Sequence, residues 1–311
     1  MTITRETDAG VRERLPHSRT ALEFGRDADA IRRLERLAIS HRKRLLELGQ
    51  TLQIRLHYGA CMSCVEILTL LYHDWMQVDP HNPGWADRDR FILSKGHAAP
   101  SLYVALAQQG FFPDHEFERF RMLGSILQGH PDRNKTPGVD CTTGSLGQGF
   151  PVGCGMALGA KIDHSPFRVY VLLSDGECNE GSVWEAALLA ANLSLDRITL
   201  LVDWNEKSSY GPMRGRNDVA PLPDKWLAFG WEVFECAGHD FVSLSGALAQ
   251  ADQVRGRPSV LLCHTTKGKG IPYAENNNTR SNFALTSAQY EEAFAHLAIL
   301  EQGPAERGGG A

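Results

Sequence analysis

The sequence predicts an α/β protein built on a doubly wound, mostly parallel sheet with helices on both faces. Two observations support this fold class. Five short runs rich in Val, Ile and Leu alternate with segments of helical periodicity, which is typical of a parallel sheet covered on both sides. The chain has 311 residues, of which 42% are hydrophobic, so it can bury a sizeable core without disulfides or metals.

The expected elements follow one another in strand and helix order. Strands are expected at residues 91–94, 168–174, 198–203, 231–236 and 258–264. Helices are expected at residues 28–49, 65–75, 102–108, 183–192, 225–229 and 242–254. Gly49 stands at the end of the first helix, where a C′ glycine commonly terminates a helix.

One domain is expected over 27–303, between a flexible N-terminal arm (1–26) and a tail (304–311). The arm lacks the apolar core of a signal peptide, and no apolar run reaches the ~18 residues of a membrane span. The formal net charge of −5 argues against a nucleic-acid or polybasic membrane partner. The seven scattered cysteines indicate reduced thiols in a cytoplasmic protein. We expect Cys61 and Cys64 to be buried small residues and not a redox or metal pair.

Polar side chains follow two neighbouring strands of the predicted sheet. Asp175 comes directly after the run 168–174, and Asn205 lies 30 residues further along, after the next strand. Both should emerge at the carboxyl edge, where a carboxylate and an amide oxygen suit Mg²⁺. Gly176 would let the backbone approach a phosphate, and the next helix would offer its N-terminal N–H groups. A tight turn without a ligand is the alternative, because Asp-Gly also marks ordinary turns.

The segment around Asp175 (SDGECNEG), followed by a helix and Asp-x-Asn205, resembles the thiamine diphosphate motif of transketolases. The resemblance implies three ligands for Mg²⁺ (or Ca²⁺ or Mn²⁺): Asp175, Asn205 and the backbone carbonyl of Lys207. It also implies that Gly176 and Glu177 contact the cofactor.

Further segments match the family in the same order and cover roughly residues 30 to 300, which is more specific than any single motif. They are the SKGHA segment, the TGSLGQG loop and the TKGKG segment. The resemblance therefore implies four more contacts to thiamine diphosphate: His97, Gly144, Leu146 and Lys267.

Three residues match catalytic positions of the family. His57 stands in Leu-His-Tyr-Gly where the family has Gly-His-Pro-Gly, and we expect it to point at the reacting carbonyl. His130, in Gly-His-Pro, would reach the donor's terminal hydroxyl, and Glu180 would face the partner active site across the dimer. For His239, in Gly-His-Asp, we expect a structural turn. Ser281 occupies a position where the family has a histidine.

The resemblance implies thiamine diphosphate-dependent transfer of a two-carbon ketol unit from a ketose or ketose phosphate donor to an aldehyde acceptor. In transketolases a pyrimidine-binding domain supplies a further glutamate, and no match to that domain was found here. We therefore expect the N-terminal subunit of a split transketolase. It would join a C-terminal, pyrimidine-binding chain to form an α₂β₂ heterotetramer in the cytoplasm.

Two alternatives remain open from the sequence. The loss of the histidine at Ser281 favours a subunit of a 2-oxo-acid decarboxylating carboligase similar to deoxyxylulose phosphate synthase. A non-catalytic cofactor-binding or scaffold subunit is the other, although retention of Asp175 with Asn205 argues against it. The glycines of 144–159 do not indicate a dinucleotide site, because no strand directly precedes them.

Overall fold

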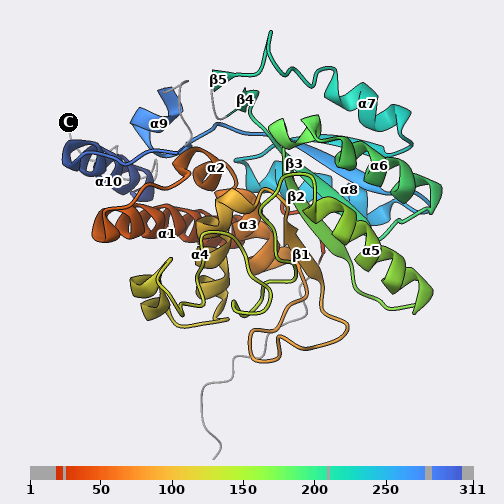
Figure 1. The fold of residues 1–311 in the computed structure, drawn as a ribbon, viewed down its shortest axis with the longest axis horizontal. Coiled ribbons are helices and arrows are strands. Elements are labelled where there is room, and N and C mark those ends of the chain that lie inside the picture. The colour runs from red at the N-terminus through yellow and green to blue at the C-terminus, as the bar shows by residue number, and fades with distance from the viewer. Residues whose placement is uncertain (1–18, 24–25, 209–210, 277–281, 303–311) are drawn as a thin grey trace, which may run out of the picture.

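The computed structural model describes residues 19–23, 26–208, 211–276 and 282–302 (Figure 1). Its centre is a five-stranded sheet in the order β1-β2-β3-β7-β6, with every neighbouring pair parallel. The strands are β1 (Arg90–Leu93), β2 (Val169–Ser174), β3 (Ile198–Trp204), β6 (Glu232–Ala237) and β7 (Ser259–His264). A short antiparallel ribbon, β4 (Lys207–Ser208) and β5 (Gly211–Pro212), follows β3. The predicted parallel sheet is thus confirmed.

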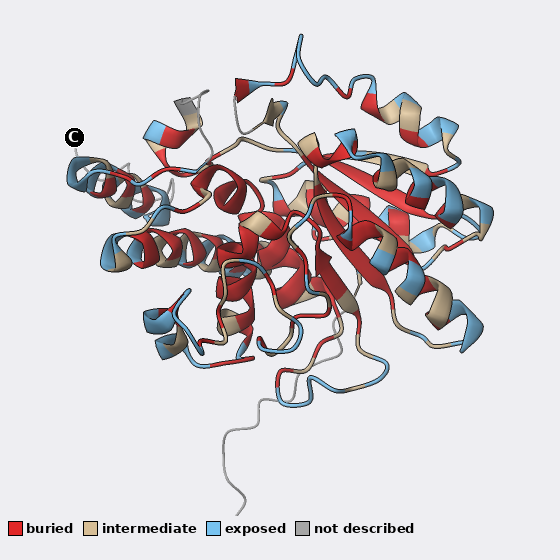
Figure 2. Ribbon diagram, viewed as in Figure 1, coloured by how far each residue is buried: buried red, intermediate tan, exposed pale blue. Residues whose placement is uncertain are grey.

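Helices cover both faces of this sheet. Successive side chains of a strand point to opposite faces, so each strand contributes to two hydrophobic clusters. On β2, Val169, Val171 and Leu173 belong to one hydrophobic cluster, and Tyr170 and Leu172 belong to the other. The first cluster includes residues of α5 (Gly149–Ile162), α6 (Gly181–Asn192) and α7 (Leu222–Ala228). The second includes residues of α1 (Ala28–Leu52), α2 (Tyr58–Ser63), α3 (Val65–Leu70), α4 (Ala99–Gln109), α8 (Phe241–Gln253) and α10 (Ser287–Glu301). Figure 2 shows β1, β2, β3 and β7 almost wholly buried between the two layers, whereas the edge strand β6 is largely half-buried or exposed.

The expected strands all occur within one or two residues of their predicted ends, but four helix predictions need correction. The helix expected at 102–108 is α4, which begins three residues earlier, at Ala99. The helix expected to end at Gly49 continues to Leu52 and is capped by Gln53, which adopts the left-handed conformation. Gly49 instead makes room for the Tyr58 hydroxyl, which a Cβ would overlap. The segment 65–75 is α-helical only to Leu70 and continues as a π-helical turn, Leu71–Trp75. The helix expected at 225–229 is α7, which begins three residues earlier.

Helix α5 was not predicted, because its glycines resemble a loop. The structure gives two of them a packing role. A Cβ at Gly149 would lie 2.8 Å from the Ser94 backbone, and one at Gly153 would lie 2.6 Å from the Val171 side chain. These glycines therefore let the helix lie directly against β1 and β2. Three further helices were not predicted either: the short helices α2 and α9 (Pro272–Asn276), and the longer α10.

Part of the expected N-terminal arm contacts the domain. Arg19 donates to both carboxylate oxygens of Asp89, at 2.8 and 2.6 Å, and Leu22 is 8% exposed. Residues 1–18, 24–25 and the tail 304–311 lie outside the described residues, so the expected boundaries stay predictions. Cys61 and Cys64 are both buried free thiols, as expected. Within the described ranges, no helix is long and apolar enough to cross a membrane.

Candidate functional site

The carboxyl ends of β2 and β3 bring Asp175 and Asn205 together, because the two strands pair in parallel. Asp175 is buried, and its carboxylate accepts three backbone hydrogen bonds. One oxygen accepts from the N–H of Gly176 at 2.7 Å. The other accepts from the N–H groups of Asn205 at 3.0 Å and Glu206 at 2.6 Å. The loop after β3 is thereby fixed against the end of β2.

Asp175 has no cationic side chain as a partner among the described residues. Burial and, next, the neighbouring charge of Asp203 raise the pKa of its carboxyl to about 6, against the lowering effect of its backbone hydrogen bonds. A buried carboxylate that forms no ion pair within the protein is stabilised by any cation that binds it. The group therefore has the electrostatics expected of a metal ligand.

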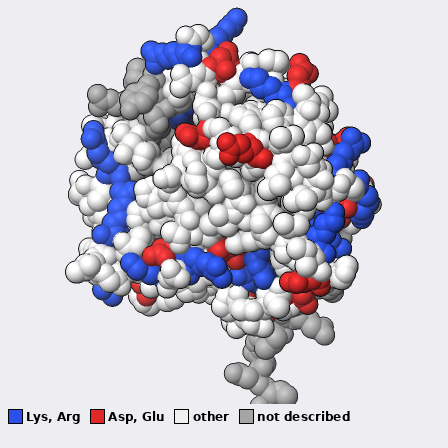
Figure 3. Space-filling model, turned by 45° about the vertical axis from the view of Figure 1, so that its right-hand side comes forward, with Lys and Arg blue, Asp and Glu red and all other residues white. Residues whose placement is uncertain are grey.

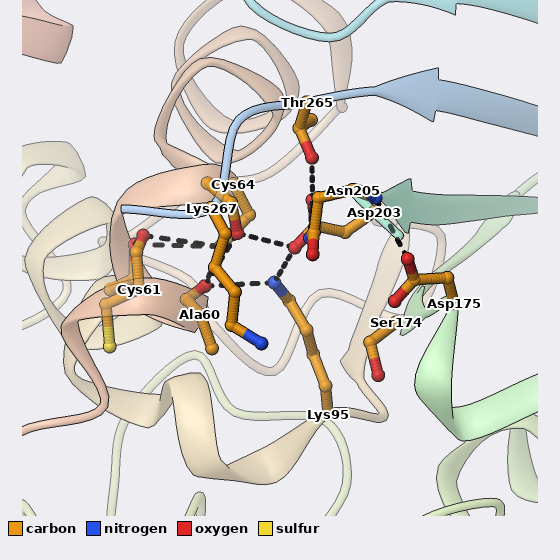
Figure 4. Close-up of polar contacts among 12 residues, drawn as sticks. Ala60, Cys61, Cys64, Lys95, Ser174, Asp175, Asp203, Asn205, Thr265 and Lys267 are labelled. Atoms are coloured by element: carbon orange, nitrogen blue, oxygen red, sulfur yellow. Dashed lines mark hydrogen bonds and ion pairs between the residues drawn. The ribbon is translucent and has the colours of Figure 1, made fainter. Parts of the chain in front are cut away.

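Asp203, one strand away, is neutralised within the chain. The Lys95 ammonium lies 2.5 Å from it, and the hydroxyls of Ser63 and Thr265 also donate to its carboxylate (Figure 4). Burial alone would raise the pKa of Asp203, but the Lys95 charge holds it below its usual value. This buried pair was not predicted. The available signal was a lysine and an aspartate within two of the matched segments, since buried charges require partners.

Lys267 and Lys207, two predicted site residues, meet directly. The Lys267 ammonium donates to the backbone carbonyls of Lys207 at 2.7 Å and Ser208 at 2.8 Å. Burial lowers the pKa of the Lys267 ammonium to about 8. The amide oxygen of Asn205 accepts from the Lys207 N–H at 3.3 Å. The carbonyl expected to bind metal thus carries a cationic donor in this structure.

A cavity of about 220 Å³ opens between these strand ends. Seven of the predicted residues line it: His97, Leu146, Asp175, Gly176, Asn205, Lys207 and Lys267. A Cβ at Gly176 would meet nothing within 4 Å, so open space adjoins the backbone there. Buried carboxylate, amide and carbonyl oxygens beside a lysine and a bare backbone suit a metal-bound phosphate group.

His57, His130 and Gly144 lie beside this cavity but do not line it. The ring of His57 stands edge-on to that of His97, with centroids 5.2 Å apart. A Cβ at Gly144 would lie 3.6 Å from the His130 ring. Burial lowers the pKa of His57 to about 4 and of His97 to about 3, so both rings are neutral near pH 7. Within the described part of the chain, Nδ1 of His57 is buried without a hydrogen-bond partner.

The two predicted glutamates do not line the cavity. Glu177 points inward, where its carboxylate accepts from the Ser94 hydroxyl at 2.5 Å and the Gly147 N–H at 2.8 Å. Its direct contact with a cofactor stays a prediction. Glu180 is exposed at the start of α6, where the partner-facing residue was expected. Ser281 lies outside the described residues.

The family described as "Transketolase, thiamine diphosphate binding domain" matches residues 39–298. Among curated proteins, the chain is 43% identical to the 6-deoxy-6-sulfo-D-fructose transketolase subunit SqwG of Clostridium sp. (strain MSTE9). This match covers 78% of the chain and 88% of the relative. The chain is also 38% identical to an apulose-4-phosphate transketolase subunit of Phocaeicola vulgatus, over 85% of the chain and 93% of that protein.

Solved structures show the same similarity. Transketolase from Leishmania mexicana superposes with a TM-score of 0.79 at 29% sequence identity, over 85% of the present chain and 41% of its own. Transketolase from Campylobacter jejuni gives the same TM-score and identity, over 85% of the present chain and 42% of its own. The present chain therefore spans about two fifths of these transketolase chains but most of the two subunits.

Proposed function

Because this chain belongs to the transketolase family through its thiamine diphosphate-binding domain, we propose that it is the diphosphate- and metal-binding subunit of a two-chain transketolase. The reaction is transfer of a two-carbon ketol unit from a ketose or ketose phosphate to an aldehyde. Its relatives are named for sulfofructose and apulose 4-phosphate, which supports a sugar carrying an anionic group as substrate. The single observation that carries the proposal is the cavity at the ends of β2 and β3, lined by an Asp175 carboxylate that forms no ion pair among the described residues and interacts with the Lys267 ammonium only at longer range.

The donor set fits a hard divalent cation such as Mg²⁺, or Ca²⁺ or Mn²⁺ in its place. Asp175 would supply a carboxylate oxygen, Asn205 its amide oxygen and Lys207 its backbone carbonyl, and phosphate oxygens and water would complete the shell. Gly176 gives the diphosphate room beside the backbone. Once bound, thiamine diphosphate supplies an electron sink that stores the carbanion formed on the donor carbon.

The chain's own side chains would orient the substrate. His57 and His97 are neutral imidazoles, so each can donate one hydrogen bond and accept another. Nδ1 of His57, unpartnered among the described residues, is available to an oxygen of the donor, and His130 lies close enough to share this role. Such donors stabilise charge that develops on the substrate oxygens.

We further propose that the active site is completed by a pyrimidine-binding subunit in an α₂β₂ assembly. The two relatives that this chain covers almost completely are both named as subunits. The helices α5 and α6 expose Val152, Leu188 and Leu189, which are 43%, 52% and 51% accessible. Figure 3 turns the side of the molecule with these helices toward the viewer and shows a broad area without charged side chains. Glu180 begins α6 and would face the partner.

The test is ketol transfer with the chain alone and after mixing with a pyrimidine-domain chain encoded beside it. Thiamine diphosphate and Mg²⁺ are present in both assays. We expect turnover only in the mixture, and loss of turnover when the mixed chain carries Asp175→Ala. Robust turnover by the chain alone would contradict the two-chain proposal, and full activity of the Asp175 variant would contradict the site.

The decarboxylating alternative rests on Ser281, a sequence observation outside the described residues. It predicts carbon dioxide release from pyruvate, whereas ketol transfer releases none. Both named relatives are transketolase subunits, which favours ketol transfer. The scaffold alternative predicts no Mg²⁺-dependent cofactor binding even with the partner present, and the uncompensated charge of Asp175 argues against it. The cytoplasmic location stays a prediction.

A further inference from the structure

His239 uses both nitrogens of its ring. It lies in the turn between β6 and α8, and is 18% exposed. Its Nδ1 is 2.8 Å from a carboxylate oxygen of Glu66, and its Nε2 accepts the backbone N–H of Thr266 at 2.8 Å. Because a backbone N–H can only donate, Nε2 must be the unprotonated nitrogen, and Nδ1–H then donates to Glu66. The ring is thus held in one neutral tautomer.

Glu66 is itself fixed from the opposite side. Arg42 of α1 donates to both of its carboxylate oxygens, at 2.6 and 2.9 Å, and all three side chains of the network lie in the interior or at its edge. Burial alone would raise the pKa of Glu66, but the Arg42 charge and the hydrogen bonds from His239 and Arg42 together outweigh it and lower the pKa to about 2. A permanently charged Glu66 always accepts, which explains why His239 presents the same nitrogen to Thr266.

Hydrogen bonds from this network fix the backbone on both sides of Lys267. His239 holds the N–H of Thr266, and Nε of Arg42 donates to the backbone carbonyl of Lys269 at 2.9 Å. From this fixed segment Lys267 reaches the carbonyls of Lys207 and Ser208 in the cavity wall. Hydrogen bonds and the backbone of 266–269 therefore connect helices α1 and α3 to the carbonyl expected to bind metal.

We propose that Arg42, Glu66 and His239 form a positioning network that sets the Lys267 ammonium at the metal and diphosphate cavity. None of the three lines the cavity, so their effect passes through the segment 266–269. The proposal rests on the proposed function, because it assigns the network a task at the same site. Its specific claim is that the acceptor nitrogen of His239 governs cofactor affinity.

Two matched variants separate the two bonds of His239. His239→Gln can place an amide oxygen near the position of Nε2 and keep an acceptor for the Thr266 N–H. His239→Asn can keep a donor for Glu66, but its shorter side chain leaves the Thr266 N–H without an acceptor. Loss of this acceptor frees the backbone of the segment that carries Lys267. We therefore expect a loss of affinity of about tenfold for His239→Asn and of less than about twofold for His239→Gln.

The measurement is titration of the full chain with Mn²⁺ at saturating thiamine diphosphate, together with amide hydrogen exchange of 265–270 in the cofactor-free chain. His239→Asn should weaken Mn²⁺ binding and speed exchange in this segment, and His239→Gln should do neither. In a Lys267→Met background, His239→Asn should cost little further affinity, because the network acts through Lys267. Should His239→Asn not fold, His239→Ser provides the same comparison.

Equal affinities and equal exchange in the two His239 variants would overturn the network. So would a lowered melting temperature of His239→Asn with unchanged affinity and exchange, since that shows a role in stability alone. A wild-type chain that binds no Mn²⁺ and cofactor, even with its partner, would overturn the proposed function and the inference together. Binding by the wild type with no difference between variants would overturn the inference only.

Discussion

The two halves of the site differ in how their charges are compensated. All three of Lys95, Asp203 and Asp175 line the cavity. On the inner half, named here for the pair that lies deepest, Asp203 is paired with Lys95 and accepts from Ser63 and Thr265. On the cavity half, Asp175 accepts only N–H groups and has no cationic partner among the described residues. Two aspartates at the ends of adjacent strands thus have different tasks. The compensated one stabilises the fold, and the uncompensated one is available to a ligand.

The largest expected effect is a loss of stability when the Lys95–Asp203 pair of the inner half is broken. Lys95→Met leaves Asp203 buried without its cation, and removing one partner of a buried pair costs about 3–5 kcal/mol. Urea unfolding of the cofactor-free chain should show this loss in the free energy of unfolding. Lys95→Met with Asp203→Asn should recover part of it. A single variant as stable as the wild type would show that the pair is not structural.

The second prediction breaks the cavity half and affects binding instead. Asp175→Asn keeps the size of the side chain but removes its charge, so metal-dependent cofactor binding should weaken at least about 100-fold, or about 2.7 kcal/mol. The free energy of unfolding should change less than in Lys95→Met, because removal of a buried charge offsets the loss of one acceptor for the backbone N–H groups. Calorimetric titration and urea unfolding measure the two quantities. Loss of stability without loss of affinity would reverse the assignment of the two aspartates.

The third prediction concerns pH and His97. Burial lowers its pKa from 6.5 to about 3, so between these values the unfolded chain binds more protons than the folded chain. With respect to His97, the free energy of unfolding is therefore highest above pH 6.5 and decreases as the pH falls below this value. From pH 6.5 to 5 the loss should be about 2 kcal/mol. Unfolding of wild type and His97→Gln over this range tests it, and parallel pH profiles would contradict it.

The smallest expected effect follows removal of one hydroxyl donor from the inner half. Thr265→Val removes one hydroxyl donor to Asp203 while Lys95 remains, so the free energy of unfolding should fall by only about 1–2 kcal/mol. Cofactor affinity should change less than about twofold, because Thr265 does not line the cavity. Thermal unfolding and calorimetric titration provide the measurements. A loss of affinity as large as that of Asp175→Asn would show that the two halves are not separable.

The fold was predictable wherever a residue's own neighbours in sequence determine its structure. The strands were found from continuous apolar runs, and the meeting of Asp175 and Asn205 followed from one strand–helix–strand unit. Contacts between distant segments were not predictable in this way. Gly49 was predicted to end a helix, because glycine commonly does so and its tertiary contact with Tyr58 cannot be read from the local sequence. Helix α5 was not predicted for the same reason, because the contacts of its glycines with β1 and β2 are tertiary.

The site was predictable as a set of residues but not as a distribution of charge. The matched motifs named seven of the residues that line the cavity. They did not show that Lys95 neutralises Asp203, that Glu177 turns inward, or that Lys267 holds the Lys207 carbonyl. Each of these depends on which buried polar groups face one another once the sheet has formed.

The most direct test of the central claim is the number of Mn²⁺ ions bound per chain in the presence of thiamine diphosphate, measured by electron paramagnetic resonance. The account predicts one tightly bound ion in the wild type, none in Asp175→Asn, and one in Thr265→Val. Equal binding by the wild type and Asp175→Asn would place the metal elsewhere and contradict the account.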